Sequence, residues 1–125
     1  MDRESNEGLV PRLPLWVAVD RRAMKKHPDT GEGYVDDVEA IKAGRLPGGA
    51  YFVLFFSSRD NTERLIEWNG DKRLVALPFD DPDVIADILR KWQVKGATEV
   101  LFDMQKDGRG RRVPLDKFIK ALAGE

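Results

Sequence analysis

The order of apolar and polar residues predicts strands that alternate with helices along most of the chain. Residues 50–56 (AYFVLFF) are uninterrupted apolar positions, which is typical of a strand buried on both faces. Residues 73–79 and 98–105 are rich in branched and aromatic side chains and predict two more strands. Residues 13–19 (LPLWVAV) have the same character, so the sequence predicts a first strand there.

Helical patterns follow these strands. Residues 57–70 open with serines, which suit the N-cap of a helix, and residues 80–96 place Asp81 at an N-cap and Pro82 at the first helical position. Residues 114–122 predict a short amphipathic helix at the end of the chain. The two longer patterns each end at a glycine, as helices often do.

The first part of the chain is less regular. Residues 1–11 are polar and charged, and we expect a disordered leader there, followed by a single domain over residues 12–125. Residues 21–49 contain several turn-forming residues, and within them residues 35–44 predict a short helix that ends at Gly44.

The element order strand, helix, strand, helix, strand indicates two crossover connections between neighbouring parallel strands. The sequence therefore predicts an α/β fold. We expect a single domain with a mixed, mostly parallel sheet of four or five strands, helices packed on it, and a C-terminal β-hairpin plus helix.

Composition excludes several kinds of chemistry. The chain has no cysteine and one histidine, so thiolate zinc sites, disulfides and cysteine nucleophiles are excluded and a catalytic triad has little support. His27 lies in a loop with lysine and proline, where we expect a surface residue. No apolar run is long enough to span a membrane, and the N-terminal residues MDRESNEGLVPR are charged and polar where a signal peptide needs an apolar stretch. We therefore expect a cytoplasmic protein, and we expect no cofactor.

Residues 106–112 (KDGRGRR) combine positive charge with glycine. Asp107-Gly108 is a strong hairpin signal, because a two-residue type I′ turn needs positive φ at both positions. The chain would then return antiparallel beside residues 98–105, and its charges would protect a sheet edge from pairing with other molecules.

The same stretch could instead bind phosphate groups or an acidic protein. It lacks the GxxxxGK[ST] pattern of a phosphate loop and has no interleaved aromatic residues for stacking on bases. With 21 basic and 22 acidic residues, the net charge of −1 also disfavours a dedicated nucleic-acid binder. The candidate binding residues are Lys106, Arg109, Arg111 and Arg112.

Four aspartates lie at or near predicted strand ends, where open parallel sheets bind ligands. If their carboxylates converge, they could hold Mg²⁺ for phosphoryl transfer, with Ser57 or Ser58 contacting the phosphate at a helix N-terminus. Each aspartate also has a simpler explanation, such as helix capping or an exposed position in a loop. The four are Asp20, Asp80, Asp81 and Asp103.

Two stretches resemble bacterial SseB-like domains, the serine-sensitivity-enhancer type. They are YFVLFFSSRDNTERLIEW and GATEVLFDMQ…VPLDKFIKAL, and the resemblance covers about residues 46–122. It implies a small α/β module of unsettled biochemical role without a known catalytic set, so no site residues are carried over.

These observations favour a non-enzymatic module that binds another protein or regulates it. We expect the contact elements to be the Arg-rich hairpin and residues 21–49, because loops on a rigid scaffold commonly carry function. Nucleic-acid or phosphate binding through the hairpin, and a magnesium-dependent phosphoryl-transfer enzyme, remain the alternatives. Any exposed tryptophan among Trp16, Trp68 and Trp92 would mark a contact surface.

Overall fold

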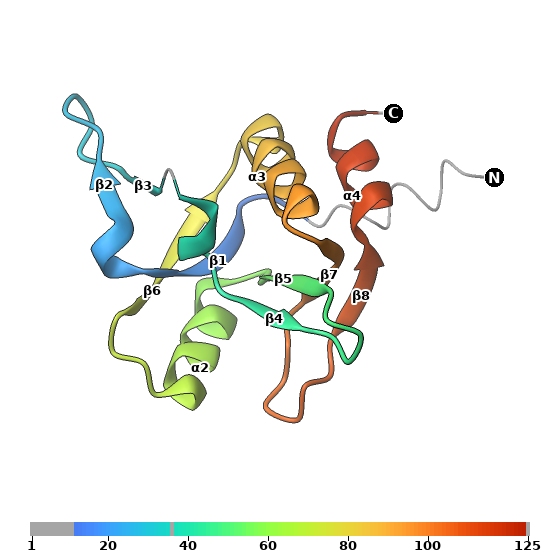
Figure 1. Cartoon of the computed structure of the whole chain (residues 1–125). Helices are drawn as coiled ribbons and strands as arrows, with labels where there is room; N and C mark the ends of the chain where they lie inside the picture. The colour runs from blue at the N-terminus through green and yellow to red at the C-terminus, as the bar shows by residue number, and fades with distance from the viewer. Residues whose placement is uncertain (1–11, 36, 125) are drawn as a thin grey trace.

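Strands and α-helices alternate over residues 51–102, whereas the part of the chain before them consists of strands and single 3₁₀ turns (Figure 1). The computed structural model describes residues 12–35 and 37–124, so the predicted leader at 1–11 lies outside the described residues. The elements, with η for a 3₁₀ helix, are β1 (Leu15–Asp20), η1 (Arg21–Ala23), β2 (Met24–Lys26), β3 (Gly33–Val35), η2 (Val38–Ala40), β4 (Ala43–Arg45), β5 (Tyr51–Phe55), α2 (Arg59–Asn69), β6 (Leu74–Phe79), α3 (Pro82–Val94), β7 (Ala97–Phe102), β8 (Arg111–Pro114) and α4 (Leu115–Leu122).

A mixed four-stranded sheet in the order β4-β5-β7-β8 forms the centre of the fold. Its two inner strands are parallel, with Val53 opposite Val100, whereas β4 and β8 pair antiparallel with them at the outside. The α/β class is therefore confirmed. The expectation of a mostly parallel sheet is wrong, because β5 and β7 are the one parallel pair among the described strands.

The strand predicted at 73–79 is present as β6, but it does not join β5 and β7. It pairs antiparallel with β1 in a separate two-stranded sheet. Pro78 fits this position, because proline lacks an N–H and is confined to strand edges. The two predicted crossovers are thus one long connection from β5 to β7, made of α2, β6 and α3.

The central sheet is covered on both faces (Figure 1). Val53 and Phe55 of β5 belong to a buried cluster with residues of α3 and α4, whereas Leu54 and Phe56 pack with Leu65 of α2. This alternation explains why the strand sequence is apolar at every position. Each such buried side chain contributes about 1.5–3 kcal/mol to folding.

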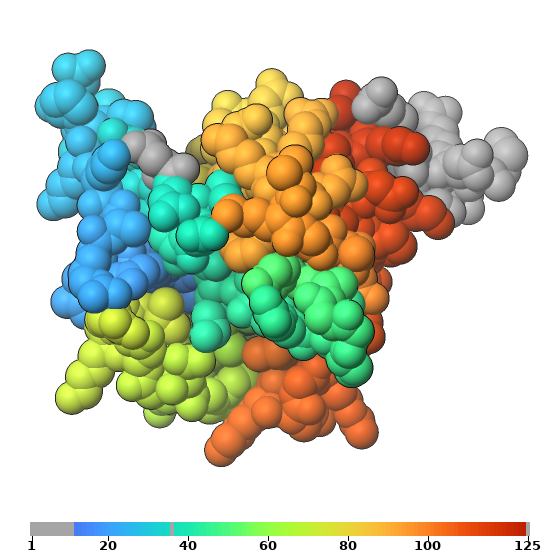
Figure 2. Space-filling view, viewed as in Figure 1, coloured from blue at the N-terminus to red at the C-terminus, as the bar shows by residue number. Residues whose placement is uncertain are grey.

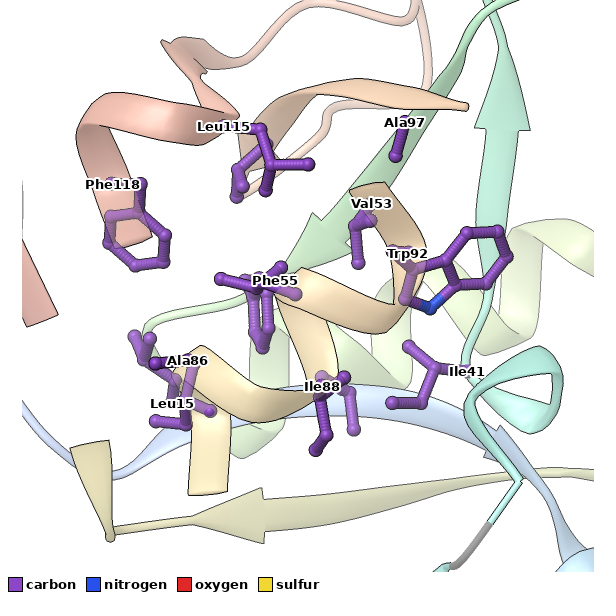
Figure 3. Packing of buried hydrophobic residues seen from close by; sticks show 14 of the residues in the cluster. Leu15, Ile41, Val53, Phe55, Ala86, Ile88, Trp92, Ala97, Leu115 and Phe118 are labelled. Atoms are coloured by element: carbon purple, nitrogen blue, oxygen red, sulfur yellow. The ribbon is translucent and has the colours of Figure 1, made fainter. Parts of the chain in front are cut away.

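An aromatic group connects α4 to the sheet. The rings of Phe55, Phe102 and Phe118 contact one another, with the closest centroids 5.2 Å apart in an edge-to-face arrangement. Figure 3 shows Phe118 and Leu115 of α4 on the side of Phe55 away from Trp92. All four apolar positions of the predicted helical pattern are buried, namely Leu115, Phe118, Ile119 and Leu122.

The helix ends are as the sequence predicts. The Ser58 side chain accepts a hydrogen bond from the backbone N–H of Asn61, and α2 ends at Gly70 with φ of 73°. The Asp81 carboxylate accepts from the N–H of Asp83, and Pro82 occupies the first turn of α3.

The helix expected at 35–44 is wrong. The described part of this range holds η2 and the start of β4. Asp37 caps η2 through the N–H of Glu39, and Val38 is buried. Gly44 is a strand residue packed under the ring of Phe52, where a Cβ atom would come within 2.3 Å of a ring carbon. Gly44 therefore allows the Phe52 ring to approach the backbone closely, and it does not cap a helix.

Candidate functional site

The predicted chain reversal after β7 is confirmed, since β7 and β8 form an antiparallel hairpin. The Gln105 N–H donates to the Arg109 carbonyl over 2.7 Å, and the Gly108 N–H donates to the Gln105 carbonyl over 2.9 Å. This pattern defines a three-residue loop with Gly108 in the left-handed region at φ 87°. The expected two-residue type I′ turn is wrong, because Asp107 does not adopt a positive φ.

The hairpin cations are exposed, but they do not form one cluster. Arg109 at the tip pairs with Asp107 over 3.3 Å, and Lys106 has no ion-pair partner among the described residues. Arg111 lies over the Phe102 ring, 5.9 Å from its centroid, on the side of α4. Because strand side chains alternate, Arg112 points to the opposite side of the sheet, where α2 lies.

Asp103 connects the end of β7 to the start of α2. Its φ of 53° turns the chain out of the sheet in a conformation that aspartate tolerates better than most residues. Its carboxylate accepts hydrogen bonds from the Ser57 N–H at 2.8 Å and from the Asn61 side-chain amide at 3.1 Å. An anion near a helix N-terminus is also favourable. Asp103 thus positions the chain that follows it beside α2.

The strand-end aspartates of β1 and β6 lie far apart along the strands. In the antiparallel register Asp20 is opposite Leu74, whereas Asp80 follows the residue that is opposite Leu15 at the other end. Within residues 12–35 and 37–124, no three His, Asp or Glu side chains are close enough to share a metal ion. The convergence that the magnesium hypothesis requires is therefore not found among the described residues.

Asp20 and Asp81, like Asp103, form hydrogen bonds with residues close to them in the fold. The Asp20 carboxylate accepts hydrogen bonds from the Arg22 side chain and backbone, and these bonds lower the pKa of Asp20 to about 2. The Asp81 carboxylate caps α3. Asp81 therefore has the capping role that the sequence predicts, whereas Asp20, expected to begin an exposed loop, is the last residue of β1 and caps η1.

The single histidine is an exposed residue, as expected. His27 follows β2 directly at the base of the β2–β3 hairpin loop, where its N–H donates to the Glu32 carbonyl, and its ring stacks on Tyr34 with a centroid separation of 4.3 Å. This hairpin projects from the molecule in Figure 1. Among the described residues, neither Ser57 nor Ser58 forms a hydrogen bond with His27, and the Ser58 hydroxyl caps α2.

The three tryptophans differ in exposure. Trp92 is buried, Trp16 is half-buried, and Trp68 on the last turn of α2 keeps 36% of its surface exposed. Trp92 lines a groove of about 420 Å³ together with Tyr51, Glu39 and Lys95. The two charged residues of this groove form an ion pair with each other, and its hydrogen bond raises the pKa of Lys95. Its charges are already compensated within the chain.

Trp68 instead lies beside the hairpin. It lines a shallow depression between α2 and the segment after β7, with Asn61 and Arg64 on the helix and Asp103, Met104 and Gln105 on the segment. Met104 packs on the buried cluster beneath α2. We call the surface formed by Arg64, Trp68, Met104, Lys106, Arg109 and Arg112 the α2–hairpin face.

Figure 2 shows the hairpin tip projecting from the rim of the molecule next to α2. Sequence reasoning found the hairpin cations but missed Arg64 and Met104. The spacing of Arg64 and Trp68, four residues apart on one helix face, was the available signal. That this helix face lies beside the hairpin depends on the turn at Asp103, which the sequence alone does not reveal.

No model of a known protein family matches the chain, and no curated protein does. The resemblance to SseB-like domains therefore stays a prediction. Across the described residues, the helices are too short and too polar to cross a membrane.

Proposed function

We propose that this chain is a protein-binding module whose α2–hairpin face contacts an acidic surface of a partner protein. The observation that carries the proposal is that the exposed Trp68 and Arg64 share a depression with Met104 and Gln105, the segment that leads into the cationic hairpin. Tryptophan and arginine dominate the binding energy of protein interfaces, and methionine is also enriched in them. A rigid aromatic residue flanked by cations suits a partner with acidic groups around an apolar centre.

The local charges support an acidic partner surface at the α2–hairpin face. Glu63 on α2 is paired with Arg59, and Asp107 is paired with Arg109. No ion pair of Arg64 or Lys106 is found in the part of the chain that the structure describes. Arg112 is paired with Glu99 at 3.9 Å, so the uncompensated positive charge of the face lies at Arg64 and Lys106, although the whole chain has a net charge of −1.

Affinity capture with substituted chains tests the proposal. We expect that Trp68→Ala and the double variant Arg64→Glu/Arg112→Glu each lose a partner that the unchanged chain retains from its own cell extract. Arg111→Glu is the matched control, because Arg111 lies on the other side of the sheet. We expect the chain with this substitution to retain the partner. Circular dichroism of each variant verifies folding. Equal recovery with Trp68→Ala would refute the proposal.

Nucleic acid is the alternative ligand for the same cations. Titration of a labelled single-stranded oligonucleotide at two salt concentrations separates the two possibilities, because phosphate contacts release counterions and weaken steeply with salt. If the oligonucleotide bound tightly and in a salt-dependent way, and the double variant Arg109→Glu/Arg112→Glu abolished that binding, the ligand of this face would be a polyanion and not a protein. Absence of oligonucleotide binding leaves the protein partner as the proposal.

A further inference from the structure

A second groove lies between the β2–β3 hairpin and the β1–β6 pair. It encloses about 330 Å³, and apolar side chains form most of its lining. Trp16 and Pro78 are direct neighbours across the two strands, and Leu77 contributes from the next position. Trp16 packs against the buried cluster beneath α2 and is half-buried as a whole residue.

Two carboxylates border this groove. Glu32 is the residue before β3 and Asp80 is the residue after β6. Neither carboxylate has an ion-pair partner among the described residues. Other exposed carboxylates, such as Glu67 and Asp116, are also without an ion pair among the described residues, so what distinguishes Glu32 and Asp80 is their shared place at the border of one groove.

We propose that this groove binds an arginine or lysine side chain of a partner polypeptide. The aliphatic stem would pack on Trp16 and the prolines, as long basic side chains do on apolar surface. The charged head would then lie between Glu32 and Asp80, and a cation near an indole face gains further attraction. This proposal is independent of the α2–hairpin face, which presents the opposite charge to its partner.

The chemistry of the groove excludes other occupants. An anionic side chain would meet two uncompensated carboxylates, which repel it. A neutral apolar side chain would use the apolar lining but gain no attraction from Glu32 and Asp80, both of which are exposed. A cationic side chain alone matches both the apolar lining and the charge of the border.

Titration of the full chain with blocked pentapeptides tests the proposal. The probes have four glycines around a central arginine, lysine, citrulline or glutamate, and the readout is the indole N–H signal of Trp16 in NMR spectra. The Trp16→Phe variant assigns that signal. We expect saturable shifts with the arginine and lysine peptides, and affinity at least about tenfold lower for the citrulline and glutamate peptides.

The double variant Glu32→Gln/Asp80→Asn should lose the binding of the arginine peptide, since the groove keeps its shape but not its charge. The matched control is Glu67→Gln/Asp116→Asn, which removes two exposed carboxylates outside the groove and should bind the peptide as the unchanged chain does. Equal binding of the citrulline peptide, equal loss in the control variant, or no response of Trp16 to the arginine peptide would each overturn the proposal.

Discussion

At the scale of single residues, Asp20 has the clearest electrostatic signature. Hydrogen bonds from Arg22 lower its pKa to about 2 from the ordinary 3.8. A lowered pKa in the folded state means that the interaction stabilises the fold above pH 3.8 and is lost as the pH falls through about 2. We expect a carboxyl titration by NMR to show this low midpoint, and Arg22→Ala to move it up toward 3.8. An unchanged midpoint in that variant would contradict the assignment.

Residue-scale signals were the most reliable part of the sequence. The caps at Ser58, Gly70 and Asp81 were predicted because a cap bonds to backbone groups a few residues away, so the sequence contains both partners. The ligand hypothesis for Asp20 and Asp80 had no such basis. Their separation depends on whether two distant strands run parallel or antiparallel, which neither residue encodes.

At the scale of elements, the sequence predicted the strands better than their pairing. The strand at β6 was identified from its apolar residues, but its partner was not, because β1 precedes it by more than 50 residues. Pro78 was the overlooked signal, since a missing N–H favours a strand with one free edge. The prediction of a helix at residues 35–44 was wrong for another reason. A single 3₁₀ turn and a short strand do not have enough residues for a distinct period.

The hairpin between β7 and β8 allows a sharp test at this scale. Gly108 has φ of 87°, which an alanine side chain strains, whereas a Cβ atom there meets nothing within 4 Å. We therefore expect Gly108→Ala to lower the free energy of unfolding by about 1–2 kcal/mol through backbone strain alone. Gly48→Ala is the control, because Gly48 has open space and no positive φ. Urea unfolding measures both, and equal stability of the two variants would contradict the left-handed turn.

At the scale of the whole molecule, the two buried clusters share three strands, β1, β5 and β7. Successive residues of β5 belong to the cluster under α3 and α4 and to the cluster under α2, so neither layer can separate without exposing β5. Because α4 is attached through Phe118, which is fully buried against Phe55 and Phe102, the C-terminal helix should unfold together with the sheet. This coupling predicts one cooperative transition.

Phe118→Ala tests that coupling. Removing a buried phenylalanine leaves a cavity between α4 and the sheet and should lower the free energy of unfolding by about 3–5 kcal/mol. Lys117→Ala changes the neighbouring exposed residue and should alter stability by less than about 0.5 kcal/mol. Thermal unfolding followed in parallel by helix content and by tryptophan fluorescence measures both effects. If the signals separated into two transitions, with helix content lost first, α4 would unfold independently of the sheet. The strands shared by the two clusters would then not make unfolding cooperative.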